Sequence, residues 1–261
     1  MNKYRHHVLT ALRAASLVLF TGSQGVGQAA QPAEVLPREI KIAAKKNPGD
    51  VRYDQFYDLQ QRLIGYLPPE PRMFDAVQRV SFTRLSLEEQ DAYEPPGWAV
   101  SIVGESIDET VPIRRGGYFV LPYLEDAYKG RASVMFKHQS KRNYTDTAWV
   151  MRIGESRQLT YADFGKALEQ LREVQDTIPI IRAINYRVEK YSNYDGLKAC
   201  FLDTSGAMLI DGNPAAHAVV GNCWVLRYDP KQANGGPLIE FRGKLDIVTL
   251  IETEPYLRTK S

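Results

Sequence analysis

Alternation of apolar and polar residues, repeated along most of the chain, is the feature that most constrains the fold. Residues 76–85 show it over one long run, with the period of two that is typical of a half-buried strand. Similar strand-like runs occur at 98–103, 109–113, 118–122, 132–137, 148–153, 197–202, 207–210, 222–228, 238–242 and 245–251. So many short runs separated by turn residues predict a mostly β protein with antiparallel pairing.

A glycine pair marks one of the predicted turns. Gly116 and Gly117 separate two apolar runs, and we expect them to close a β-hairpin between 109–113 and 118–122, because glycine adopts positive φ at little steric cost.

Two stretches carry helical rather than strand spacing. Residues 51–64 place aromatic and aliphatic side chains three or four apart, and 160–176 do the same behind a Thr-Tyr-Ala-Asp start at Thr160 that resembles a capping box. The fold class predicted is therefore α+β, mostly β. It has a helix plus an antiparallel β-sandwich-like domain at 51–157 and a helix plus a second antiparallel β block at 158–261. One core and two cores both remain open.

The beginning of the chain has the three parts of a secretory signal. Three basic residues and no acidic one occupy residues 1–30, an apolar run covers 14–20, and small residues end the segment at Ala29 and Ala30. The apolar run is shorter than the roughly 20 residues that cross a bilayer. We predict a signal peptide at 1–30, an extended lead-in at 31–50 and no transmembrane segment after signal removal; an uncleaved N-terminal anchor is the alternative.

Removal of this segment changes the net charge. The chain has 33 basic and 31 acidic residues, and the first 30 residues hold three of the basic ones, which leaves 30 against 31, or about −1. A chain so nearly neutral has no field that attracts nucleic acid, so nucleic acid is excluded as an expected partner.

Cys200 and Cys223 are the two cysteines of the chain. An even number in an exported protein predicts a disulfide, and the periplasm or the extracellular space is where such a bond persists. Each cysteine lies in a separate predicted strand, so the bridge joins either neighbours in one sheet or two facing sheets. Two buried free thiols are the alternative.

Catalytic and metal-binding patterns are scarce. After the signal only His138 and His217 remain as histidines, and no spacing of His and Cys is typical of a metal site. Oxygen ligands for calcium gather at Asp203 and at 211–213, but this pattern also fits a plain turn. A Cys-His-Asp set through His217 needs Cys223 as a free thiol. We therefore predict no catalytic residue, no cofactor and no metal.

Paired carboxylates stay open, because a sequence does not show which acids face each other. Glu88, Glu89 and Asp91 lie together, and Glu252 and Glu254 alternate near the end of the chain.

Four tyrosines form the candidate binding surface: Tyr118, Tyr123, Tyr128 and Tyr144. A tyrosine ring offers an apolar face and a polar edge, which suits a sugar or a protein surface. The alternative is that tyrosine in strands serves as core-edge packing.

Residues 98–103 and 111–122 resemble a pattern seen in known modules, in which a strand is followed by a Gly turn, an aromatic residue and a Leu-Pro pair that close a hairpin. On this basis 77–153 resembles transthyretin-like or carboxypeptidase-regulatory-like β-sandwich modules. The resemblance implies a non-catalytic accessory or binding module, and it carries over no functional residue.

Together these patterns lead us to expect an exported, non-enzymatic binding or assembly protein whose partner is an envelope protein or glycan. An envelope glycan hydrolase using unidentified paired carboxylates and a structural subunit of an envelope complex are the alternatives.

Overall fold

The computed structural model describes residues 51–94, 99–136, 143–178, 193–233 and 236–258. The predicted signal peptide, the lead-in and His138 lie outside these residues. Within them no helix has the length and hydrophobicity needed to cross a membrane.

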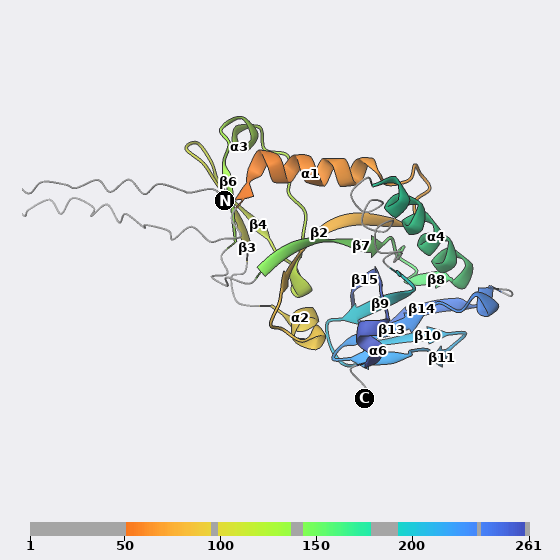
Figure 1. Ribbon diagram of the computed structural model, residues 1–261. Helices are drawn as coiled ribbons and strands as arrows, with labels where there is room; N and C mark the ends of the chain where they lie inside the picture. Colours follow the sequence, from red (N-terminus) through yellow and green to blue (C-terminus); the bar gives the residue numbers. More distant parts are fainter. Residues whose placement is uncertain (1–50, 95–98, 137–142, 179–192, 234–235, 259–261) are drawn as a thin grey trace, which may run out of the picture. The chain divides into compact units, whose positions relative to one another are not determined.

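Three antiparallel sheets dominate the described chain, which confirms the predicted α+β, mostly β class (Figure 1). One four-stranded sheet contains, in order, β1 (Val51–Arg52), β6 (Ser133–Phe136), β3 (Ala99–Val103) and β4 (Asp108–Pro112). A second contains β11 (Asn213–Pro214), β10 (Ala207–Ile210), β14 (Leu238–Arg242) and β8 (Gln158–Thr160). The third is seven-stranded, with β12 (Ala218–Val220), β13 (Cys223–Arg227), β9 (Gly196–Phe201), β15 (Leu245–Ile251), β7 (Asn143–Met151), β2 (Phe74–Phe82) and β5 (Tyr118–Phe119).

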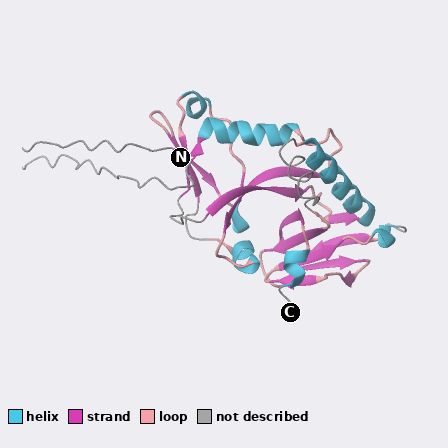
Figure 2. Ribbon diagram, viewed as in Figure 1, coloured by secondary structure: helices cyan, strands magenta, loops and turns pink. Residues whose placement is uncertain are grey.

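The described helices, shown in cyan in Figure 2, are mostly short. They are α1 (Tyr53–Gly65), α2 (Leu87–Ala92), α3 (Glu125–Lys129), α4 (Tyr161–Thr177) and α6 (Glu254–Arg258), with 3-10 turns η1 (Arg115–Gly117) and η2 (Pro230–Ala233). Helices α1 and α4 lie where the helical spacing predicts them.

The seven-stranded sheet takes strands from both predicted β blocks. Strands β2, β5 and β7 precede residue 157, whereas β9, β12, β13 and β15 follow it. The link is β15, which pairs with β7 on one side and with β9 on the other. Helix α4 therefore does not divide two sheet systems, because it covers a sheet that both blocks build.

Helix α4 packs on one side of this sheet. Its first turn is capped by Thr160, whose hydroxyl oxygen accepts a hydrogen bond from the Asp163 amide at 3.0 Å. Its buried side, which includes Phe164 and Leu171, belongs to the same core as Trp149 and Leu250 of the sheet. This core is the largest buried apolar cluster in the described chain.

The predicted disulfide is present and joins neighbours in one sheet. Cys200 on β9 lies directly opposite Cys223 on β13, with a Cα–Cα distance of 4.0 Å. Of the two arrangements left open by the sequence, the structure has the cross-strand bridge within one sheet.

The predicted hairpin around Gly116 and Gly117 is wrong. Strand β4 pairs with β3 in one sheet and β5 pairs with β2 in another, so only an isolated bridge between Arg114 and Tyr118 joins the two segments. The turn itself needs glycine: Gly117 has φ +97°, and a Cβ there would come within 2.3 Å of the Val80 carbonyl oxygen. Close approach to β2, rather than a two-strand turn, explains this glycine pair.

Candidate functional site

The second side of the seven-stranded sheet is polar at its centre. Arg79 lies opposite both Asp146 and Tyr118, and Lys198 lies opposite Thr249. Residues directly opposite in antiparallel strands share a face, and so do alternate residues along one strand. We name this set, Arg79, Tyr118, Asp146, Lys198 and Thr249, the polar face; it lies on the side opposite the core under α4.

Helix α2 supplies an acid to the polar face. Its start is fixed by a capping box between Ser86 and Glu89. Its buried residue Gln90 makes the hydrogen bonds to β2 that a neighbouring strand would make. The Gln90 Nε2 group donates to the Val80 carbonyl at 3.0 Å, and Oε1 accepts from the Phe82 amide at 2.9 Å. This fastening to β2 holds the next residue, Asp91, over the polar face.

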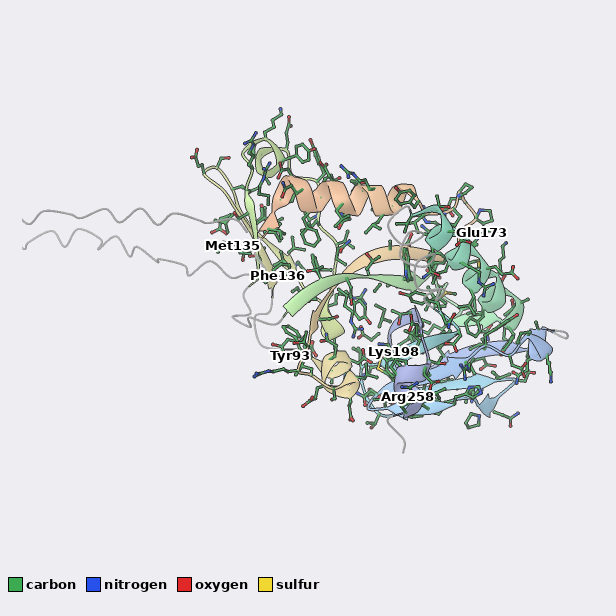
Figure 3. The ribbon with its side chains drawn as sticks, viewed as in Figure 1. Tyr93, Met135, Phe136, Glu173, Lys198 and Arg258 are labelled. Atoms are coloured by element: carbon green, nitrogen blue, oxygen red, sulfur yellow. A yellow bond between two sulfur atoms is a disulfide. The ribbon has the colours of Figure 1, made fainter. Side chains whose placement is uncertain are left out.

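Asp91 joins two cations and a phenol in one buried cluster. The Lys198 ammonium donates to the Asp91 carboxylate at 2.5 Å, and the Arg79 guanidinium donates to it at 2.6 Å. Tyr256, from α6, donates its hydroxyl to Asp91 at 3.2 Å and accepts from Lys198 at 3.0 Å. The Lys198 side chain, labelled in Figure 3, is fully buried. Charges this deep require close partners, and each has them.

The cluster fixes the charge of its members. Burial alone would raise the pKa of Asp91, but the Lys198 ammonium and the Arg79 guanidinium outweigh it and hold that pKa below its usual range. Burial likewise acts to lower the pKa of Lys198, and Asp91 outweighs it, so the ammonium pKa lies above its usual value. At neutral pH Asp91 and Lys198 are therefore held in their ionised forms.

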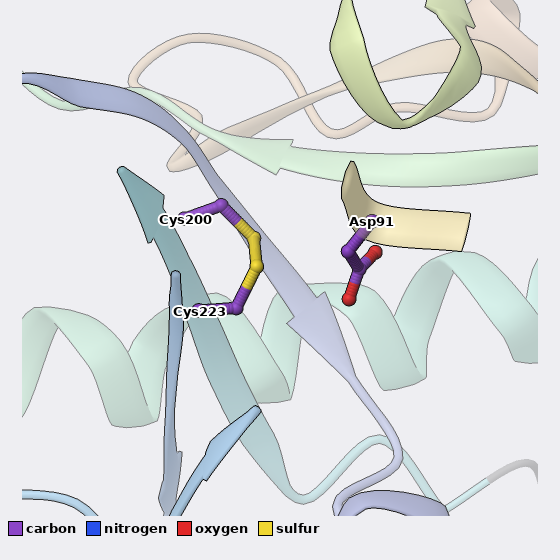
Figure 4. A group of neighbouring side chains, drawn as sticks. All are labelled: Asp91, Cys200 and Cys223. Atoms are coloured by element: carbon purple, nitrogen blue, oxygen red, sulfur yellow. A yellow bond between two sulfur atoms is a disulfide. The ribbon is translucent and has the colours of Figure 1, made fainter. Parts of the chain in front are cut away.

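The disulfide lies beside Asp91. One carboxylate oxygen of Asp91 and the sulfurs of Cys200 and Cys223 all lie within 4.8 Å of one another (Figure 4). These atoms have the composition of a metal-ligand set, but both sulfurs are bonded to each other and Asp91 is already bound by Arg79 and Lys198. A thiolate is what binds a metal, so this group does not fit one.

A groove opens next to the cluster, with a volume of about 480 Å³. Arg79, Asp146 and Thr249 line it from the sheet, Tyr256 lines it from α6, and Tyr194 and Glu252 complete the walls. We name it the sheet groove. It is the place where the buried ion cluster reaches a space large enough for a ligand.

Thr249 is the unusual residue of the groove wall. The residue is 3% exposed, and among the described buried side chains its hydroxyl is the one polar atom without a hydrogen-bond partner. An unpartnered buried hydroxyl costs free energy.

The titratable groups of the groove differ in their proton affinity. Loss of solvation raises the pKa of Asp146, although Arg79 opposes the shift and the side chain retains contact with solvent. Burial raises the pKa of Tyr194 to about 12, with the carboxylates of Glu252 and Asp146 adding to the shift. The groove therefore presents a phenol donor beside two acids.

The four predicted surface tyrosines do not form one surface. Tyr118 is 4% exposed and lies under the Arg79 guanidinium, 4.9 Å from ring centroid to cation, so it is not part of an exposed surface, although it lines the sheet groove. Tyr123 is 59% exposed and lies 6.2 Å from Tyr128, centroid to centroid. Tyr144 belongs to β7, but its side chain lies outside the described part.

Tyr123 and Tyr128 instead meet Tyr57 of α1, which lies 5.5 Å from the first ring and 6.3 Å from the second. The Tyr128 hydroxyl donates to the Asp58 carboxylate at 2.9 Å. These rings pack against one another, away from the buried ion cluster, in the cluster of side chains around α1 and α3.

The other sequence candidates have structural roles. His217 accepts a hydrogen bond from the Arg227 amide at 3.1 Å through Nδ1, and Cys223 is oxidised, so no nucleophile–base pair forms. Asp203 accepts from the Ser205 amide at 3.1 Å, as turn residues do. Asp211 accepts from the amide of Leu238, the first residue of β14, at 2.9 Å.

Sequence reasoning missed Arg79, Asp146, Lys198 and Thr249 as site residues. Each reads as an ordinary strand position, and no local pattern marks it. The one available signal was the Ser-Leu-Glu-Glu sequence starting at Ser86, a capping box that predicts α2 and so a buried position near Asp91.

Comparison of this chain with protein-family models, with curated proteins and with solved structures finds no match, so the geometry of the sheet groove is the basis for assigning its function.

Proposed function

We propose that this protein is an exported envelope protein that binds a polar ligand in the sheet groove. Export rests on the N-terminal signal pattern, and the Cys200–Cys223 disulfide agrees with a periplasmic or extracellular location. The resemblance of 77–153 to transthyretin-like modules stays a prediction; a binding role is what that resemblance implies.

The ion cluster favours binding over proton transfer. Asp91, Arg79 and Lys198 hold one another in their charged forms, because the pKa of the acid is lowered and that of each base is raised. A general acid or base works best with a pKa near the working pH, which these groups lack. Charged groups held in a fixed geometry instead suit a preorganised binding site.

The observation that carries the proposal is the polar lining of the groove beside the buried ion cluster. Asp146, Tyr194 and Glu252 supply hydrogen-bond donors and acceptors to this one space. A few polar groups that converge on one concave site are typical of ligand recognition.

Site-specific photo-crosslinking in the native host tests the proposal. A photoreactive amino acid replaces Glu252 in the groove wall, and in a matched control it replaces Val219, an exposed residue of β12. We expect a defined adduct from position 252 and none from 219, with the adduct identified by mass spectrometry. Equal labelling from both positions, or none from position 252, contradicts the proposal.

The paired acids of the groove support a second candidate, an envelope glycan hydrolase. Asp146 has a raised pKa, and Glu252 lies in the same groove. The negative charges of both acids contribute to the raised pKa of Tyr194. Two carboxyl groups whose environments differ are one requirement for an acid and a base or nucleophile in glycoside hydrolysis, and a separation of about 5 to 10 Å is the other.

Release of reducing ends from purified envelope glycan measures this activity. Under the hydrolase candidate the wild type releases them, whereas Asp146→Asn and Glu252→Gln lose nearly all activity without any loss of melting temperature. Glu240→Gln, on β14 in a different sheet, is the control and keeps full activity. A wild type without activity on such glycans leaves binding as the function.

A further inference from the structure

The sheet groove lies between two strand edges. Its lining includes the consecutive residues Thr147, Ala148 and Trp149 of β7, and 249–252 at and just beyond the end of β15. Successive side chains of a strand point to opposite faces. A groove that touches successive residues of both strands therefore runs along their edges and reaches their backbone groups.

The strand register shows why the edges separate. Strand β15 pairs with β7 at Thr249–Val150 and Leu250–Trp149, whereas β2 stays paired with β7 along its whole length. Beyond these pairs β15 follows β9: the Asp195 amide donates to the Ile251 carbonyl at 3.2 Å. Within the described ranges no strand pairs with the β15-facing edge of β7 over 143–148. Unpaired strand edges are templates for a further strand.

Glu252 and Pro255 also line a neighbouring hollow of about 450 Å³, so the two spaces adjoin at these residues. Asn193 and Arg227 line this second space as well. Two adjoining spaces suit a linear chain better than a compact small molecule.

The charges of the groove define the side chains it would accept. Arg79 is already paired with Asp91, whereas Asp146 and Glu252 line the groove, and no ion pair joins either acid to another described residue. The acids that remain for a ligand favour a basic side chain.

We propose that the sheet groove takes an extended polypeptide segment of a partner protein, which pairs as an added strand with the edge of β7 between Thr145 and Ala148 and places a lysine or arginine between Asp146 and Glu252. Strand addition is an established mode of peptide recognition, in which backbone hydrogen bonds supply affinity and side-chain pockets supply specificity. This inference rests on the proposed binding function and names the class of its ligand.

Random twelve-residue peptides displayed on phage provide the probe, selected on the exported protein purified from its host. We expect the enriched peptides to share a basic residue within a β-prone stretch. A synthetic copy of the best peptide is then methylated at one backbone nitrogen at a time. Methylation at alternate positions weakens binding about tenfold, because each lost backbone hydrogen bond has a cost of that order; methylation at the intervening positions leaves binding unchanged. The protein itself is unaltered, so misfolding of a variant does not affect the result.

Two variants test the side-chain part of the proposal. Glu252→Gln lowers affinity for the basic peptide about tenfold, and Glu240→Gln, outside the groove, leaves it unchanged. Selection of no peptide above background, or methylation losses without alternation, overturns strand addition. A glycan adduct at position 252 also overturns it but retains the proposed binding function, whereas absence of any specific adduct removes both.

Discussion

The two sides of the seven-stranded sheet are built from alternate residues of the same strands, yet they serve different ends. One side, which includes Leu197 and Leu250, is apolar and forms the core under α4. The other carries Lys198 and Thr249, one residue away from each, and meets the buried acid of α2. Period-two alternation thus produced a core on one side and a polar site on the other.

The difference teaches that burial alone does not distinguish a core from a site. Lys198 is as fully buried as Leu197. The apolar side is stabilised by area removed from water, which needs no exact partner. The polar side depends on specific partners, because each buried charge is costly without them. The two sides should therefore respond differently to substitution.

The largest effect is expected on the polar side. Lys198→Met removes one partner of a buried ion pair and should lower the free energy of unfolding by about 3 to 5 kcal/mol, measured by urea denaturation. Lys231→Met, at an exposed position of η2, is the control and should change it by less than about 0.5 kcal/mol. A loss below about 1 kcal/mol for Lys198→Met would mean that the ion cluster does not stabilise the fold.

Truncation of one side chain on the core side should lower the free energy of unfolding somewhat less. Leu171→Ala in α4 leaves a cavity in the apolar core and should cost about 2 to 4 kcal/mol. Glu173→Ala, exposed on the same helix, is the matched control and should be nearly neutral. Equal stability of both variants by thermal denaturation would refute the assignment of this helix face to the core.

Removal of the disulfide should have an effect near 3 kcal/mol. The double variant Cys200→Ala, Cys223→Ala removes a cross-link between residues 23 positions apart. For a loop of this size the chain-entropy relation gives a stabilisation of about 3 kcal/mol. Reduction of the wild type with dithiothreitol should produce the same shift in melting temperature. A double variant as stable as the oxidised wild type would show that β9 and β13 are held by packing alone.

Asp91 of α2 and Asp146 of the polar face should respond to pH with opposite signs. Asp91 has a lowered pKa in the folded state, so the stability that it contributes is present above about pH 4 and is lost as the pH falls. Between pH 6 and pH 3 the free energy of unfolding should therefore fall more steeply in the wild type than in Asp91→Asn.

Asp146 has a raised pKa in the folded state, so its ionisation reduces stability as the pH rises above about 4. The free energy of unfolding of Asp146→Asn should therefore exceed that of the wild type between pH 4 and pH 7. This difference should disappear below pH 4. Urea titrations at each pH measure both variants; parallel curves for Asp146→Asn and the wild type would contradict the assignment.

Much of the secondary structure followed from local patterns. The period of two located β2, β9 and β15 to within two or three residues, and the helical spacing with its Thr160 cap located α4. These features are local, since they depend on side chains a few residues apart. The hairpin at Gly116 was wrong for the converse reason: a glycine pair fixes local backbone geometry but does not fix which strand lies beside it.

The sequence by itself determined the longer strands and the two long helices, α1 and α4, and its two cysteines indicated the disulfide. Only the tertiary structure decided that Arg79, Asp91, Asp146 and Lys198 meet, although up to 119 positions separate them. The physical reason is that sheet order and register follow from long-range packing and loop closure, to which no short pattern is sensitive. The same long-range pairing drew β15 toward β9 and opened the groove in which the proposed function lies.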